Sequence, residues 1–297
     1  MRNDAFAEYH PTVNFTFFAF VLFFSMVLRH PAAQLISLFT AVLYAFQCGG
    51  KSALKPTVFA GLPLIFFTAI INPAFNHAGV TVLSFLPNGN PLTLESVMYG
   101  LSSGVMLCTV LVWFYNFNRV MTSDKFVYLF GKIIPALSLV LSMALRFIPR
   151  FIKQFSVVRD AQKCIGRDTD SGNILRRFKN TVAVFSVMVT WSLENSIETA
   201  DSMKSRGYGL RGRTAFSIYK FEPRDKTALF LILFCGIAVL SVFVSRGLAF
   251  QYFPSIRCVP ATPVTMGAQI IYFVLCIIPF ANNEREAKKW TALHSKI

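Results

Sequence analysis

The stretch of this sequence that most resembles a reactive site is a phosphate-binding-loop pattern at residues 45–52. It reads Ala-Phe-Gln-Cys-Gly-Gly-Lys-Ser, with alanine in place of the first glycine. A working loop of this kind follows a buried strand and belongs to a nucleotide-binding α/β domain. Here one apolar stretch precedes the pattern and another begins a few residues after it. We therefore expect no nucleotide site, and we interpret Lys51 and Lys55 as charges that set membrane topology.

Cysteine and histidine residues are too scattered to indicate metal or disulfide chemistry. The six cysteines include no Cys-x-x-Cys pair, and most lie in or beside apolar stretches, where a free thiol behaves as a small hydrophobic group. The four histidines lack the spacing of metal ligands, and no HExxH, GxSxG or Asp-rich diphosphate motif is present. We expect no catalytic residue, no metal site and no cofactor.

The composition is typical of a membrane protein. Of the 297 residues, 54% are hydrophobic and 14% are charged, against roughly 25% charged in soluble domains. An apolar helix crosses a bilayer in about 20 residues. Stretches without Asp, Glu, Lys or Arg provide about six such helices, at residues 11–28, 32–50, 56–94, 96–118, 227–245 and 258–283. The sequence therefore predicts an all-α, polytopic helical membrane protein.

The longest of these stretches, 56–94, is expected to contain one span near residues 57–71. A basic turn at 51–56 precedes it, and an Asn-, Gly- and Pro-rich loop follows at 72–93. Thr93 then caps the next helix, because threonine is a favoured N-cap residue.

A seventh apolar stretch, 133–145, is too short for a span and contains Pro135. We interpret it as interfacial or re-entrant. No cleavable signal peptide is expected, because the first residues include Asp4, Glu8 and Pro11 and lack a small-residue cleavage site.

The distribution of Lys and Arg predicts the orientation in the membrane. Residues 150–226 contain 15 basic and 8 acidic residues, so they contribute 15 − 8 = +7 of the net charge of +15. The loop at 72–93 contains no Lys or Arg, and 247–265 contains only Arg257. Because basic loops stay in the cytoplasm, we expect the middle segment and the C-terminal tail inside and the two poorly charged loops outside. This pattern accounts for the positive charge without a nucleic-acid partner.

The segment 119–226 differs from the rest of the chain. A helix is expected to start at Ser123, a second to run from about 150 to 165, and a third to run to about residue 206 after a break at 171–173. In the third helix, apolar residues recur every three or four positions, at Val182, Phe185, Val189, Leu193, Ile197, Ala200 and Met203. Such a stripe indicates a helix lying on another surface, either a docking partner or the membrane itself.

The last two of these helices end in related turns. Each ends in a small or polar residue, one further residue and a glycine, with a basic residue at or beside the turn; the residues are Cys164, Ile165, Gly166 and Arg167 in the first and Ser205, Arg206 and Gly207 in the second. Glycine at a helix end permits a left-handed cap and close approach of a partner backbone. An arginine there can form forked hydrogen bonds to a carboxylate. Ordinary helix capping would leave the same pattern, so the residues alone do not decide between the two interpretations.

A family resemblance favours docking. The sequence is similar to the transmembrane T components of energy-coupling factor (ECF) importers, the EcfT/CbiQ family. The resemblance covers roughly 29–214 and rests on landmarks in the same order: Arg29-His30-Pro31, Asn72-Pro73, Leu94-Glu95-Ser96 with Tyr99-Gly100, and Leu145–Pro149. Its most specific part is Ser205-Arg206-Gly207, at a position where the family has Ala-Arg-Gly. At the family's earlier Ala-Arg-Gly, this chain has Cys164-Ile165-Gly166, and Arg167 is the candidate substitute for the missing arginine.

The resemblance implies a non-catalytic transporter subunit in the plasma membrane. Its two cytoplasmic coupling helices would dock on two ABC-type ATPase subunits, and it would hold a substrate-binding S component that imports a vitamin or a metal ion. The chain would then comprise membrane helices at 1–118, a coupling segment at 119–226, and membrane helices with a basic tail at 227–297. A self-sufficient carrier or an intramembrane enzyme is the alternative, but both need reactive or ionisable groups that the apolar stretches largely lack.

Overall fold

A computed structural model describes residues 4–85, 89–131, 134–169, 173–210, 219–258 and 262–294, and these residues are predominantly helical. The chain divides into two compact units. The first comprises Met1–Thr122 with Tyr219–Ile297, and the second comprises Ser123–Ile218.

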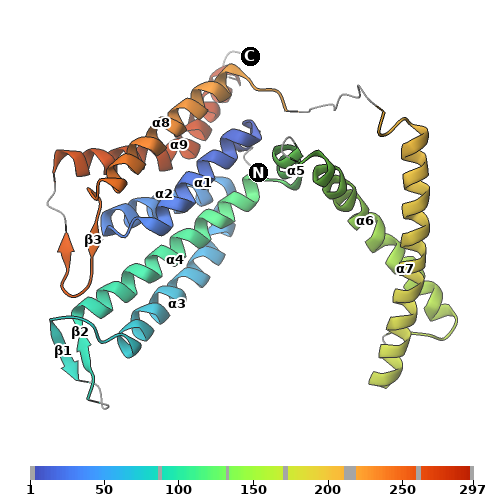
Figure 1. Ribbon diagram of the computed structural model, residues 1–297, viewed down its shortest axis with the longest axis horizontal. Coiled ribbons are helices and arrows are strands. Elements are labelled where there is room, and N and C mark those ends of the chain that lie inside the picture. Colours follow the sequence, from blue (N-terminus) through green and yellow to red (C-terminus); the bar gives the residue numbers. More distant parts are fainter. Residues whose placement is uncertain are drawn as a thin grey trace. The chain divides into compact units, whose positions relative to one another are not determined.

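The first unit is a bundle of apolar helices (Figure 1). A short 3-10 helix, Ala5–Glu8, precedes them, and the helices are α1 (Pro11–Val27), α2 (Pro31–Gly49), α3 (Lys51–Phe75), α4 (Leu94–Val120), α8 (Pro223–Val244) and α9 (Pro263–His294). By length and hydropathy, α2, α4, α8 and α9 can each cross a membrane. Shorter apolar helices at Pro11–Val27 and Phe59–Phe75 complete the set. The prediction of an all-α, polytopic membrane protein is confirmed.

The connection between α2 and α3 is shorter than expected. Residues 51–56, predicted to form a basic turn, are already the first residues of α3. Gly50 alone reverses the chain, with φ of +59°, a backbone angle that glycine adopts at little cost. That prediction was wrong, because the helix begins directly after Gly50 and includes Pro56. The predicted cap of α4 is confirmed, since the Thr93 hydroxyl accepts a hydrogen bond from the Ser96 amide at 3.4 Å.

Aromatic rings from three elements fill the centre of the first unit. Phe6, Phe17, Phe18 and Trp113 are fully buried. The Phe6 and Phe17 ring centroids lie 5.2 Å apart, and those of Phe17 and Trp113 lie 5.9 Å apart, both edge to face. The Trp113 indole nitrogen donates to the Ser37 hydroxyl at 3.0 Å, so its buried polar atom is satisfied by α2. These contacts hold α1, α2 and α4 together.

Glycines let α3 and α4 approach each other closely. A Cβ atom added at Gly100 would lie 2.7 Å from the Thr68 carbonyl oxygen, and one added at Gly104 would lie 2.8 Å from Ile65 Cα. The four-residue spacing of Gly100 and Gly104 places both on the same face of α4. Small residues at this spacing permit close packing of helices in membranes, where burial of apolar surface gives little driving force.

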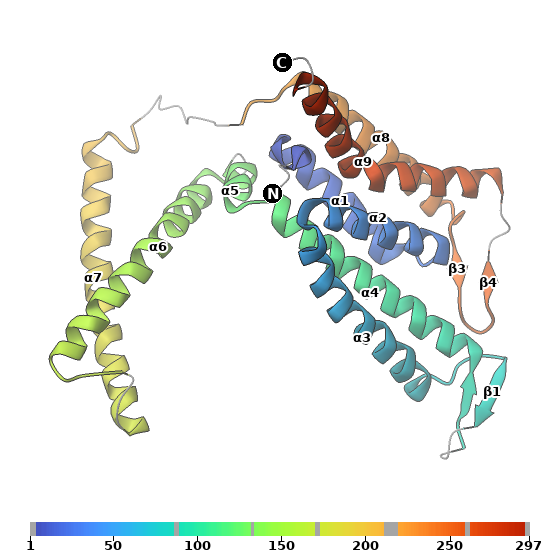
Figure 2. The same cartoon turned by 180° about the vertical axis from the view of Figure 1, so that it is seen from behind.

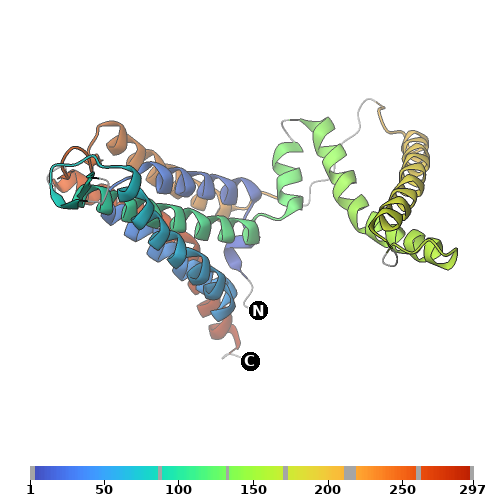
Figure 3. The ribbon, with the colours of Figure 1, turned by 90° about the horizontal axis from the view of Figure 1, so that it is seen from below.

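Two short hairpins occupy the regions that were expected to be outside loops. One pairs β1 (Val82–Phe85) with β2 (Pro91–Thr93), and the other pairs β3 (Phe250–Gln251) with β4 (Arg257–Cys258). Both hairpins lie at the end of the bundle opposite the chain termini (Figures 2 and 3). Turn-forming residues at 87–88 lie outside the described part of the chain.

The described residues of the second unit form three helices, α5 (Ser123–Gly131), α6 (Pro135–Cys164) and α7 (Ile174–Ser205). The start at Ser123 is confirmed. The predicted separate helix from about 150 is wrong, because residues 135–164 form one helix, α6, of 30 residues. The interfacial or re-entrant position of 133–145 in the membrane stays a prediction. Pro135 starts the helix, where its missing N–H costs nothing, and Pro149 is tolerated inside it. Residues 132–133, and residues 171–172 of the expected break, lie outside the described residues.

Candidate functional site

The end of α6 forms a helix-terminating turn around Gly166. The Gly166 amide donates to the Lys163 carbonyl at 3.0 Å, and the Arg167 amide donates to the Gln162 carbonyl at 3.0 Å. These two bonds, with Gly166 at φ of +79°, define a Schellman motif. Ile165 is the capping residue before the glycine, and its side chain is 71% exposed.

The end of α7 repeats this turn around Gly207. The Gly207 amide donates to the Lys204 carbonyl at 2.9 Å, and the Tyr208 amide donates to the Met203 carbonyl at 3.0 Å. Gly207 has φ of +76°. Arg206 is the capping residue, with φ of −84° and ψ of 11°, close to the −87° and 6° of Ile165. The two turns therefore have the same backbone conformation.

Because the backbones match, the two turns can be compared side chain by side chain. Cys164 corresponds to Ser205, and Ile165 corresponds to Arg206, so one turn presents an apolar cap and the other a guanidinium. Arg167 follows the glycine and corresponds to Tyr208, so it leaves the backbone from a different position than Arg206. These seven predicted site residues form two separate clusters at the ends of α6 and α7, and all but Gly207 are exposed.

The first turn is fixed from α7. The Asn180 side-chain amide donates to the Asp168 carbonyl at 2.7 Å, and the Arg177 Nε donates to the Thr169 carbonyl at 3.1 Å. Asn180 is 8% exposed, so its bond is shielded from water. Sequence reasoning missed this residue; the available signal was an asparagine in the interior of a helix, where its propensity is poor.

Helices α6 and α7 pack across each other (Figure 1) through an aromatic contact. The Trp191 ring centroid lies 5.7 Å from that of Phe147, and the Arg150 guanidinium lies 5.8 Å from the Trp191 centroid. Arg150 also donates to the Asn195 side-chain oxygen at 3.3 Å. Val184 and Met188, on the same side of α7, are fully buried. The two turns are thus carried by helices that contact each other where they cross.

The predicted apolar stripe of α7 faces away from this packing. Phe185, Leu193 and Ile197 are 61%, 62% and 65% exposed. The interpretation that the stripe lies on another surface is not fulfilled within the described residues of this chain. It leaves the second unit with a large apolar surface, which in a soluble monomer would be a liability.

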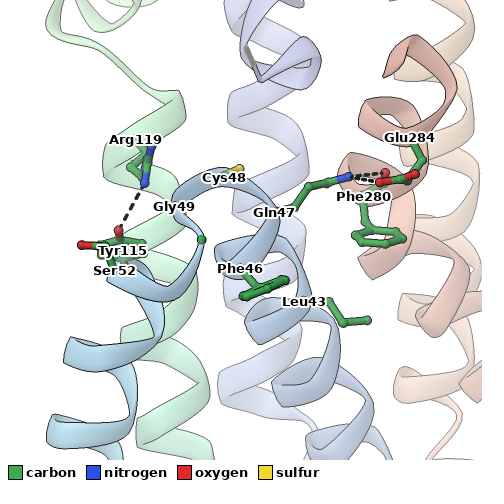
Figure 4. A pocket seen from close by; sticks show the side chains of 11 residues that line it. Leu43, Phe46, Gln47, Cys48, Gly49, Ser52, Tyr115, Arg119, Phe280 and Glu284 are labelled. Carbon is green, nitrogen blue, oxygen red and sulfur yellow. Dashed lines mark hydrogen bonds between the residues drawn. The ribbon is translucent and has the colours of Figure 1, made fainter. Parts of the chain in front are cut away.

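The phosphate-binding-loop pattern lies in the first unit, at the junction of α2 and α3 (Figure 4). Gly49, Gly50 and Ser52 line a cavity of about 740 Å³, with Arg119 and Glu284 among the other lining residues. A helix precedes the pattern and another follows it at once. The Gln47 amide donates to Glu284 at 3.0 Å. The strand and the surrounding α/β sheet that a nucleotide loop needs are not found in the described residues of this unit.

Accordingly, the purified chain alone is expected neither to bind nor to hydrolyse ATP. Lys51→Ala should change neither property, because we interpret Lys51 as a charge that sets membrane topology. Equilibrium binding of a fluorescent ATP analogue to wild type and to Lys51→Ala checks this. Saturable binding to the isolated chain that disappears in the variant would contradict it.

Comparison with known proteins adds an independent line of evidence. The family model CbiQ, described as cobalt transport protein, matches residues 9–218. That range includes α1 to α7 and both turns.

Several curated relatives carry the name energy-coupling factor transporter transmembrane protein EcfT. The EcfT 1 protein of Listeria monocytogenes serotype 1/2a (strain 08-5578) is 28% identical over 194 residues, which cover 60% of this chain and 71% of that protein. The protein of Bacillus selenitireducens is 27% identical over 252 residues, 78% of this chain and 90% of its own length. The protein of Lactococcus lactis subsp. cremoris is 32% identical over 105 residues, which cover only 40% of it.

Proposed function

The chain belongs to the CbiQ family of cobalt transport proteins, and from this we propose that it is the membrane-embedded T subunit of an ECF-type importer. In this role it links ATP binding and hydrolysis by two ABC-type ATPase subunits to the uptake of a vitamin or a metal ion by an S component. It contributes no catalytic residue of its own and works in the plasma membrane.

The observation that carries this proposal is the pair of exposed turns with matching backbones at the ends of α6 and α7. Each turn lies at the end of a helix and is exposed, apart from the half-buried Gly207. In this proposal, each turn inserts into a groove on one ATPase subunit. In the second turn, Arg206 supplies forked donors for a carboxylate of the ATPase. In the first, Ile165 supplies an apolar contact, with Arg167 beside it. The two ATPase grooves are then not equivalent, as expected of two different subunits.

Coupling follows from the way α6 and α7 are joined. When ATP binding closes the ATPases, the two turns move with their grooves. The contacts of Trp191 with Phe147 and of Arg150 with Asn195 make the helices respond together rather than singly. The exposed stripe through Phe185, Leu193 and Ile197 provides the surface through which this movement reaches an apolar partner, the S component in the membrane.

The turns must face the cytoplasm for this to work, and two native cysteines allow a direct test. Cys164 lies in the first turn and Cys258 in the β3–β4 hairpin, and both are exposed. In variants that retain only one of them, a membrane-impermeant maleimide should label Cys258 in intact cells and Cys164 only in inside-out vesicles. Labelling of Cys164 from outside would refute the orientation.

The function is tested by assembly. An affinity-tagged chain, purified from membranes of its native host in mild detergent, should carry two ABC-type ATPase subunits and a small membrane-embedded S component. Reconstituted into vesicles, the complex should take up substrate only when ATP is supplied on the ATPase side. Uptake by the chain alone, without ATPases, would favour a self-sufficient carrier instead.

A further inference from the structure

A groove between α8 and α9 combines an apolar wall with a basic end. It has a volume of about 400 Å³. Leu231 of α8 and Val274 and Ile278 of α9 supply apolar side chains, and Arg224 and Arg285 lie where the two helices carry their charged ends. Both helices are long and apolar enough to cross a membrane. The groove therefore runs from the apolar part of the bundle to the level at which phospholipid headgroups are found.

The charged side chains that line this groove are both arginines. Among the residues that line the groove, none is acidic. The Arg224 Nε forms an ion pair with the Glu222 Oε2 atom at 2.9 Å. The Arg224 guanidinium also lies 5.4 Å from the Tyr9 ring centroid. This leaves the two terminal nitrogens of Arg224 for another acceptor. Within the described residues, Arg285 makes no ion pair closer than 4.0 Å.

The buried carboxylate of Asp225, next to Arg224 in the chain, accepts hydrogen bonds from backbone amides. Asp225 is 2% exposed. One of its oxygens accepts from the His10 amide at 3.2 Å and the other from the Glu222 amide at 2.9 Å. Asp225 therefore serves the start of α8 and its junction with the N-terminal segment.

We propose that this groove binds an anionic phospholipid, with the phosphodiester between Arg224 and Arg285 and an acyl chain along Leu231, Val274 and Ile278. Basic pockets between membrane helices on the cytoplasmic side suit such headgroups. The apolar wall selects a lipid over a soluble phosphate ester. Both charged lining residues are arginines, and of these two only Arg224 forms an ion pair among the described residues, with Glu222, so anionic lipid is preferred over phosphatidylcholine.

The proposal is tested by retention of lipid on the full-length chain. The protein is reconstituted into vesicles of mixed phosphatidylglycerol and phosphatidylcholine, extracted in mild detergent, and its retained lipids are quantified by mass spectrometry. Wild type should retain phosphatidylglycerol preferentially. Each arginine near the membrane surface contributes roughly a fivefold preference for anionic lipid. In the double variant Arg224→Gln/Arg285→Gln, the preference for phosphatidylglycerol should therefore fall by about 25-fold.

A matched control removes the same charge elsewhere. Lys288→Gln/Lys289→Gln alters residues of α9 that do not line the groove, and it should retain the preference. Ala281→Leu, which narrows the groove without a change of charge, should lower lipid retention. An excess of glycerol phosphate should not displace the lipid. The proposal is overturned if the arginine double variant keeps its preference, if the lysine control loses as much, or if glycerol phosphate competes fully.

Discussion

Replacing Arg206 by alanine is expected to abolish ATP-driven uptake while the chain still inserts into the membrane. The side chain is exposed and lies outside the packing between α6 and α7, so its loss should not unfold the second unit. Truncating an arginine that pairs with a carboxylate in a partly desolvated groove costs about 2–5 kcal/mol of binding free energy. Binding of the ATPase subunits should weaken accordingly. The measurement is ATPase co-purification together with substrate uptake in vesicles.

Arg167→Ala is the matched control for this experiment. It removes the same charge from the other turn, but from the position after the glycine. An arginine at a solvated rim contributes about 1 kcal/mol or less, so the effect should be mild. Gly207→Val should resemble Arg206→Ala, because valine is strained at φ of +76°. Should Arg167→Ala prove the more damaging change, the second turn would not be the main contact.

Ile165→Arg asks whether the two turns are interchangeable. The backbone angles of the two turns match at the capping position. An arginine at position 165 would therefore extend from the first turn in the same direction as Arg206 extends from the second. If the first groove is adapted to an apolar residue, uptake should fall, although the protein remains folded. A gain in ATPase binding would instead indicate that both grooves accept arginine.

Gly104→Leu is expected to destabilise the first unit strongly. A side chain at this position would meet Ile65 Cα, 2.8 Å from the added Cβ, and the Thr68 hydroxyl. Backbone atoms yield less readily than side chains, so α3 would have to move away from α4. Overpacking of this kind costs about 1–3 kcal/mol, occasionally more. The thermal transition of the detergent-purified variant, followed by fluorescence, should shift to lower temperature.

Gly267→Leu serves as its control. A Cβ added at Gly267, also within a membrane helix, meets no atom within 4 Å. This variant gains the same helix propensity without the close contact, and its stability should be unchanged or improved. Equal transition temperatures for the two variants would mean that close approach of α3 and α4 does not contribute to stability.

Much of the fold follows from the sequence because lipid leaves few alternatives to helices. Uncharged stretches located the six apolar helices of the first unit, and Thr93 marked the start of α4. One part of α6 was misjudged. The short apolar stretch 133–145 with Pro135 suggested a segment separate from the next helix, whereas α6 begins at Pro135 and continues through Pro149. Pro135 at the first helical position follows a local rule, but no local pattern indicated that the helix would continue through Pro149.

The candidate site could be located from its glycines but not understood from them. Gly166 and Gly207 predicted where the helices end. The equivalence of Ile165 and Arg206 rests on matching backbone angles, and the support of the first turn by Asn180 rests on a contact across two helices. The direction of the α7 stripe was also open, since periodicity shows that a face is apolar and not what covers it.

Site-specific photocrosslinking in the assembled complex tests the central claim most directly. A photoreactive residue is placed at position 206, at position 165 and, as a control, at Ser84 in the exposed β1 strand. Our account predicts crosslinks to an ATPase subunit from 206 and from 165, to different subunits if the pair is heteromeric, and none from 84. A complex that still contains its ATPases but gives no ATPase crosslink from either turn would contradict it.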